Sequence, residues 1–321
     1  MKILWLFKYK SNWNFNHWFH MDFAYKLAEY SNIELKSYGK DMTLGYPKLD
    51  LQPYNKKTTI DSLKEKFDFD IIIIDGKSRV TNSRGRIDIL PKDFNKFNKT
   101  PKIVIEGDYH NYKTDFKWYS NNGIDIILHR HSNNVKKGEI DLPNIKHVWF
   151  PCSVDIDIFK PDSNIIRKDE IGFIGGQNVC YVHRNNVIKI LNKNKLIDIS
   201  KHRYSDERYI KYLQSYVSHI NCGSVFNIET AKMYEIMACG SVLLTNESDK
   251  DGLKDLFYKD SYCTYKEDYS DLLDKVKRII RNKNYRKYIT TRAIKCISER
   301  HTHEIRVKQL LKIIKENYGI L

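Results

Sequence analysis

Short apolar runs alternate with amphipathic stretches over the first 150 residues of the chain. Because apolar and aromatic runs of four to six residues are typical of buried strands, the pattern predicts strands at Lys2–Phe7, Ile33–Tyr38, Asp70–Asp75, Lys102–Glu106, Ile124–His129 and His147–Phe150. Apolar residues at spacings of three and four predict helices at Trp13–Tyr30, Thr59–Phe67 and Asp115–Ser120. This alternation is the signature of a parallel α/β sheet.

A second α/β block begins at Glu170, and Pro161–Asn164 before it is the best candidate hinge. The pattern predicts strands at Ile171–Ile174, Asp198–Ser200, Val217–Asn221 and Ser241–Thr245, and helices at Asn185–Asn194, at Thr230–Ala238 and from Asp268 to the end. Gly240 follows the second of these helices, where glycine takes the left-handed conformation that ends a helix. The economical reading is two Rossmann-like domains, residues 1–150 and 151–321, with a C-terminal helical tail that is free to cross back to the first domain.

Composition excludes several classes of protein. The 321 residues are 41% hydrophobic, which is enough to bury sizeable cores. The longest aliphatic run is Ile71–Ile74, far short of the ~20 residues that span a bilayer. Lys8 interrupts the N-terminal apolar run too early for a signal peptide, and six cysteines without a CxxC pair argue against a zinc site. These features predict a cytoplasmic globular protein without a transmembrane segment.

The net charge of +15 is unevenly distributed along the chain. Residues 1–150 and 266–321 carry the excess of basic side chains, whereas residues 151–265 hold 15 basic and 15 acidic ones. Lysines number 41 against 14 arginines, a bias that codon usage alone could produce. A high isoelectric point is therefore a weak sign of nucleic-acid binding in this chain.

A strand that runs into Gly175-Gly176, followed by Arg184 and a helix, is a candidate phosphate cradle. Glycine lets backbone N–H groups approach an anion, the helix N-terminus is partly positive, and arginine binds phosphate bidentately. The alternative is a tight turn without a ligand.

Glu235 lies within an otherwise apolar helix, Thr230–Ala238. A buried carboxylate needs partners, and the hydroxyls of a ribose would serve. The alternative is an ion pair with Lys232, one turn earlier on the same helix face.

This helix and the strand after it resemble the sugar-nucleotide motif of retaining GT-B glycosyltransferases of the group 1 type. The residues that fit the motif are Lys232, Tyr234, Glu235, Ala238, Cys239, Gly240 and Ser241. Three further stretches agree in order: Trp149–Pro161 resembles the interdomain segment, Ile171–Arg184 the first strand and turn of the donor domain, and Glu299–Arg306 the terminal motif of the CgeB-like subgroup. Many group 1 enzymes carry a second glutamate eight residues before Glu235, where this chain has Asn227, with Glu229 two residues away.

The resemblance implies two Rossmann-like domains that face a central cleft, and a glycosyltransferase that needs neither a metal nor a permanent cofactor. It implies a nucleoside diphosphate sugar, most readily a UDP-sugar, with transfer to an acceptor hydroxyl under retention. Gly175, Gly176 and Arg184 would face the pyrophosphate and Glu235 the ribose, with Asn227, Thr230 and Lys232 near the phosphates or the sugar. Arg184 and Lys232 would stabilise the departing diphosphate.

Two predicted strand ends in the first half carry acid–base side chains. Asp108 and His110 follow one strand, and His131 follows the next. Since ligands of parallel sheets bind beyond the carboxyl ends of strands, these residues are candidates for orienting or deprotonating the acceptor. Ordinary capping is the alternative for each of them.

Arg79, Arg84 and Arg86 lie in a loop with no acid before Asp88, which suggests an anionic acceptor. DNA with a hydroxymethylated pyrimidine or a phosphorylated polymer would fit, and the helical stretch Lys275–Arg292 could lie on an anionic membrane. A phage-type DNA glycosyltransferase and a basic nucleic-acid-binding protein without catalysis therefore remain alternatives.

Overall fold

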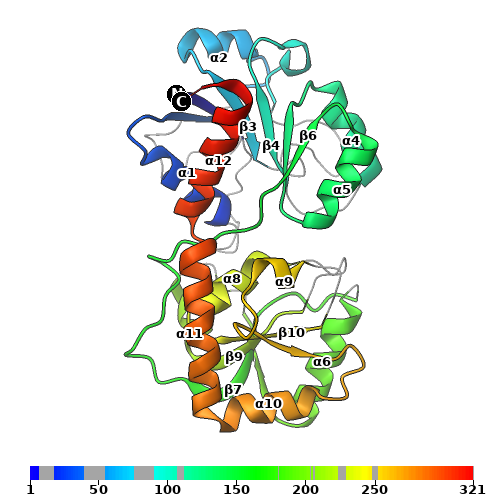
Figure 1. Ribbon diagram of the computed structural model, residues 1–321, viewed down its shortest axis with the longest axis vertical. Coiled ribbons are helices and arrows are strands. Elements are labelled where there is room, and N and C mark those ends of the chain that lie inside the picture. Colours follow the sequence, from blue (N-terminus) through cyan, green and yellow to red (C-terminus); the bar gives the residue numbers. More distant parts are fainter. Residues whose placement is uncertain are drawn as a thin grey trace. The chain divides into compact units, whose positions relative to one another are not determined.

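The computed structural model describes residues 1–6, 18–39, 55–75, 90–106, 112–179, 181–202, 204, 207–222, 229–247 and 252–320. Within these ranges the chain divides into two compact units. The N-terminal unit contains Met1–Trp13, His20–Pro151 and Val307–Leu321, and the C-terminal unit contains Asn14–Phe19 and Cys152–Arg306. Each unit is built around a wholly parallel sheet (Figure 1).

The sheet of the N-terminal unit has the strand order β2-β1-β3-β4-β5-β6. Its strands are β1 (Lys2–Leu6), β2 (Glu34–Tyr38), β3 (Ile71–Asp75), β4 (Lys102–Ile105), β5 (Ile126–His129) and β6 (Lys146–Trp149). The helices of this part of the chain are α1 (Trp18–Ala28), α2 (Ile60–Lys66), α4 (Tyr112–Asn121), α5 (Ser132–Asp141) and the 3₁₀ helix Phe94–Lys96. The strands and helices predicted here are all found, with shifted ends, and α5 is additional.

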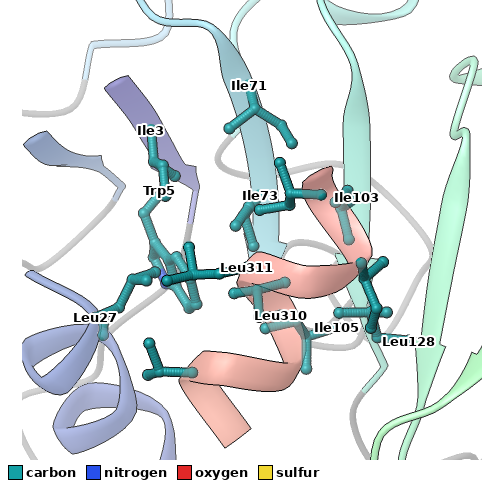
Figure 2. Packing of buried hydrophobic residues seen from close by; sticks show 14 of the residues in the cluster. Ile3, Trp5, Leu27, Ile71, Ile73, Ile103, Ile105, Leu128, Leu310 and Leu311 are labelled. Atoms are coloured by element: carbon teal, nitrogen blue, oxygen red, sulfur yellow. The ribbon is translucent and has the colours of Figure 1, made fainter. Parts of the chain in front are cut away.

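Both faces of this sheet are covered, because consecutive apolar residues in its central strands point to opposite faces. Ile71 and Ile73 point into a core that also holds α1, whereas Ile72 and Ile74 point into a core with α2 and α4. The last helix, α12 (His303–Tyr318), contributes Leu310 and Leu311 to the first of these cores, as Figure 2 shows. The C-terminal residues therefore help to fold the N-terminal sheet.

The sheet of the C-terminal unit has the strand order β11-β10-β9-β7-β8. Its strands are β7 (Lys168–Phe173), β8 (Ile197–Ile199), β9 (Tyr216–Ile220), β10 (Val242–Asn246) and β11 (Cys263–Tyr265). The helices are α6 (Val182–Lys193), α7 (Glu207–Gln214), α8 (Ala231–Ala238), α9 (Leu253–Leu256), α10 (Leu272–Arg281) and α11 (Lys283–Arg300). Gly240 has φ of +72°, which confirms the predicted left-handed residue after α8.

Candidate functional site

The carboxyl end of β7 leads into Gly175 beside the ammonium group of Lys232. Lys232 reaches across from α8, and its Nζ donates a hydrogen bond to the carbonyl oxygen of Ile174. A Cβ atom at position 175 would lie 3.4 Å from this Nζ and 3.3 Å from Cζ of Phe173. Glycine thus places no side chain between Phe173 and this ammonium group, and it lets backbone N–H groups approach an anion.

Arg184 closes the same turn from the first turns of α6. Its Nη1 donates to the carbonyl oxygen of Gly176 at 3.0 Å, and its guanidinium lies 4.2 Å from the ring centroid of Tyr181. Its Nε is buried and has no hydrogen-bond partner within the described parts of the chain. Because a buried donor without an acceptor is costly, this N–H is available to a ligand.

Glu235 is buried in α8, and its carboxylate accepts a hydrogen bond from the hydroxyl of Tyr209 in α7. Burial raises the pKa of Glu235 above its ordinary value, while the bond from Tyr209 and the charge of Lys232 lower it. Burial also raises the pKa of the Tyr209 hydroxyl, which therefore remains a donor. The carboxylate is thus held by a phenol, and Lys232 acts on it through space.

Thr230 lies at the N-cap of α8 with extended backbone. Its hydroxyl accepts a hydrogen bond of 2.6 Å from Nδ2 of Asn221, which directly follows β9. The turn after β7 and the segment after β9 therefore meet the N-terminus of α8 at one edge of the sheet. Ligands of parallel α/β sheets bind at this edge.

The two stretches at the boundaries of the C-terminal unit are hydrogen-bonded to each other. The backbone of Val154 pairs with His301 at 2.9 Å and with His303 at 3.2 Å, and Ser153 Oγ lies 2.8 Å from His303 Nδ1. Arg306 is buried and donates to the carbonyl oxygen of Cys152 at 3.4 Å. The interdomain and terminal motifs of the sequence thus form one structural element.

Several predicted site residues lie outside the described residues: Arg79, Arg84, Arg86, Asp108, His110 and Asn227. His131 is described, and it lies buried at the N-cap of α5. Within the described ranges, no group of three or more His, Cys, Asp or Glu side chains is arranged to hold a metal ion. No helix in these ranges is long and apolar enough to cross a membrane.

Sequence reasoning missed Tyr209 and Asn221, which hold Glu235 and Thr230. Nothing in the sequence near these two residues marks them, because each is brought to its partner only by the packing of α7 and β9 in the sheet. A recognisable sequence pattern exists for the motif around Glu235, and it does not include Tyr209 or Asn221.

Comparison with solved structures identifies the fold. The chain is similar over 99% of both chains to sucrose-phosphate synthase from Thermosynechococcus elongatus, with a TM-score of 0.68 and 10% identity. It is similar over 98% of both chains to a glycosyltransferase from Rickettsia africae, with a TM-score of 0.65 and 14% identity. HepE from Anabaena in complex with UDP gives a TM-score of 0.67 at 10% identity, over 98% of this chain and 100% of HepE.

Residues 185–312 match the model of a family described as glycosyl transferase-like, and a search of curated proteins finds no match. The predicted fold class is therefore confirmed: the chain has the GT-B fold of glycosyltransferases, with two parallel sheets. Residues 185–312 are glycosyltransferase-like in sequence as well. The CgeB-like subgroup stays a prediction.

Proposed function

We propose that this chain is a glycosyltransferase that transfers a sugar from a UDP-sugar to an acceptor hydroxyl. The observation that carries the proposal is that Lys232 and Arg184 both donate to backbone carbonyls of the turn around Gly175 and Gly176, those of Ile174 and Gly176 respectively. These two cations and the N-terminus of α6 offer positive charge at one place on the carboxyl edge. The solved complexes of HepE with UDP and with UDP-glucose support a uridine nucleotide as the first candidate.

In this proposal the donor's diphosphate lies against Arg184 and Lys232, and Glu235 accepts hydrogen bonds from the ribose. The acceptor oxygen bonds to the anomeric carbon as the bond from that carbon to the diphosphate breaks. Negative charge grows on the departing diphosphate, and preplaced cations stabilise it in the transition state. Such a site needs no metal, and the group 1 resemblance favours retention of configuration.

On the acceptor side, we propose Asp108, His110 and His131 as the groups that orient the hydroxyl or take its proton. Arg79, Arg84 and Arg86 would bind an anionic acceptor, DNA or a phosphorylated polymer. The basic helices α10 and α11 would allow contact with an anionic membrane from the cytoplasm.

Thermal unfolding with UDP, GDP, CDP, ADP and their sugar conjugates tests the donor site. A ligand at 100 times its dissociation constant stabilises a native site by about 2.7 kcal/mol, which is a shift of several degrees. We expect the shift with UDP and UDP-sugars, and its loss in Glu235→Ala and in Arg184→Gln. Lys193→Ala, at the far end of α6, is the matched control. Equal shifts in all variants would contradict the site.

A further inference from the structure

Three buried side chains form a continuous hydrogen-bonded row across the N-terminal sheet. Glu106 directly follows β4, His129 ends β5, and His147 lies in β6, so they come from neighbouring parallel strands. Glu106 Oε2 lies 2.6 Å from His129 Nδ1, and His129 Nε2 lies 2.8 Å from His147 Nδ1. The row ends where His147 Nε2 lies 3.1 Å from the carbonyl oxygen of Leu142. All three side chains are at least nine-tenths buried.

The imidazole rings are aligned for a bond between ring nitrogens. Their planes are inclined by 22° and their centroids lie 5.1 Å apart. With the two nitrogens 2.8 Å apart, the N–H of one ring points along its own plane at the nitrogen of the other. Both nitrogens of each ring are therefore used within the row.

The number of protons in the row follows from its three hydrogen bonds. Each bond needs one proton, and the carbonyl of Leu142 supplies none. A carboxylate and two neutral imidazoles carry two protons, so one of the three contacts would then place an acceptor against an acceptor. The distances of 2.6, 2.8 and 3.1 Å leave no such contact.

We propose that Glu106, His129 and His147 are one buried proton-binding site, which holds three protons and is neutral overall. Its donors run in one direction: the Glu106 carboxyl group donates to His129, His129 donates to His147, and His147 donates to Leu142. The site is separate from the proposed donor site, and its existence does not depend on glycosyl transfer.

The surroundings of the row favour this neutral arrangement over a carboxylate paired with an imidazolium. Glu106 Oε1 is buried and has no hydrogen-bond partner within the described residues, and a bare carboxylate oxygen is costly there. Asn134 Nδ2 lies 3.4 Å from Oε2, which it can share with the carboxyl proton. Burial lowers the pKa of His147, an effect that the Leu142 carbonyl and the charges of Glu139 and Glu106 oppose.

A glycine holds the last ring of the row in place. Gly138 is a buried residue inside α5, where glycine weakens a helix. A Cβ atom at this position would lie 2.2 Å from His147 Nδ1, the atom that is bonded to His129. The helix α5 therefore has a glycine, which lowers its stability, at a position where a side chain would displace the His147 ring.

The site makes stability depend on pH in a defined direction. In the unfolded chain a glutamate has a pKa of about 4.3 and a histidine about 6.5, so above pH 7 the unfolded chain holds one proton fewer than the row. Stability contributed by the site is then lost as pH rises, by about tenfold in the folding equilibrium per pH unit until the third proton leaves. Within the described ranges, Glu139 on α5 and the residues Arg130 and His131 that follow β5 are further charged or titratable groups near the row.

Urea unfolding of Glu106→Gln from pH 6 to 9.5 tests the site. A glutamine amide donates the third proton permanently, so the variant should fold and lose the alkaline decline that wild type shows. Glu139→Gln is the control. It removes a nearby carboxylate but leaves Glu106, His129 and His147 in place, so it should keep the decline. Equal pH slopes in wild type and Glu106→Gln would overturn the proposal.

Nitrogen NMR of the histidine-labelled wild-type protein gives a readout that does not depend on any variant folding. In the proposed row, at pH 7.5, His129 and His147 each carry one proton, on Nε2, and a bare Nδ1. Two protons on either ring, or a bare Nε2 on His147, would contradict it.

Discussion

Each of the two sheets holds a buried histidine against a glycine, but the two sites differ in chemistry. A Cβ atom at Gly138 would meet His147 at 2.2 Å, and one at Gly172 would meet His219 at 2.4 Å. His147 continues through His129 to a carboxyl group, whereas His219 Nε2 reaches the carbonyl oxygen of Leu213 at 3.0 Å. Among the described residues no acid is hydrogen-bonded to His219, and burial lowers its pKa to about 3.

This difference shows that burial by itself favours a neutral imidazole. A buried imidazole becomes part of a proton-binding site only where an acid lies within hydrogen-bonding distance. His219 is a neutral packing group enclosed by Tyr212 and Tyr216. The row that ends at His147 is, in our proposal, a site that binds a proton.

Gly138→Ala and Gly172→Ala test the shared part of this comparison and should have the largest effects. Each new methyl group would overlap a ring that packing holds in place, so we expect a loss of about 3 kcal/mol in the free energy of unfolding. Lys136→Ala, on the exposed side of α5, should change it by less than about 0.5 kcal/mol. Urea unfolding at pH 7 measures all three; a stabilised Gly138→Ala would mean that the ring is not held there.

His219→Phe tests the part that differs. Because the pKa of His219 falls from 6.5 unfolded to about 3 folded, the unfolded chain binds the extra proton between these values. The stability that neutral His219 contributes is complete above pH 6.5 and is lost as pH falls toward 3. The folding equilibrium constant then drops by about a hundredfold over two pH units. We expect His219→Phe to remove this acid loss, seen as a smaller change in the urea midpoint between pH 6.5 and 4.5. The alkaline decline assigned to Glu106 should be unchanged in the same variant.

Lys232→Met tests whether nucleotide binding depends on the charged edge of the C-terminal sheet and not on the row in the N-terminal sheet. A charge-assisted hydrogen bond contributes about 2 kcal/mol, so UDP affinity should fall by about thirtyfold. Glu106→Gln should leave that affinity unchanged. Isothermal titration calorimetry measures both, and an unaffected Lys232→Met would remove the ammonium from the donor site.

Tyr209→Phe should have the smallest effect. It removes the hydroxyl that donates to the Glu235 carboxylate and leaves the ring packing intact. Loss of one neutral donor costs about 1 kcal/mol, so UDP affinity should fall about fivefold, with the pKa of Glu235 raised further. A loss as large as that of Glu235→Ala would instead mean that the phenol itself binds the nucleotide.

The sequence by itself determined the elements whose signal is local. The run Ile71–Ile74 is apolar throughout because both faces of β3 are covered, and Gly240 marks the end of α8 because only glycine takes that backbone conformation freely. The GT-B fold followed from such elements in order together with the motif around Glu235. The helices α5 and α7 and the strand β11 were not predicted, because their apolar patterns are weak or short.

Only the tertiary structure decided which side chains meet. Tyr209 and Glu235 are 26 residues apart, and Glu106 and His147 belong to strands joined through β5. Hydrophobic periodicity reports which side of an element is buried, and it carries no information about the partner that a buried polar group finds. That partner depends on strand order and register, which long-range packing fixes, and on room for the rings, which Gly138 and Gly172 provide.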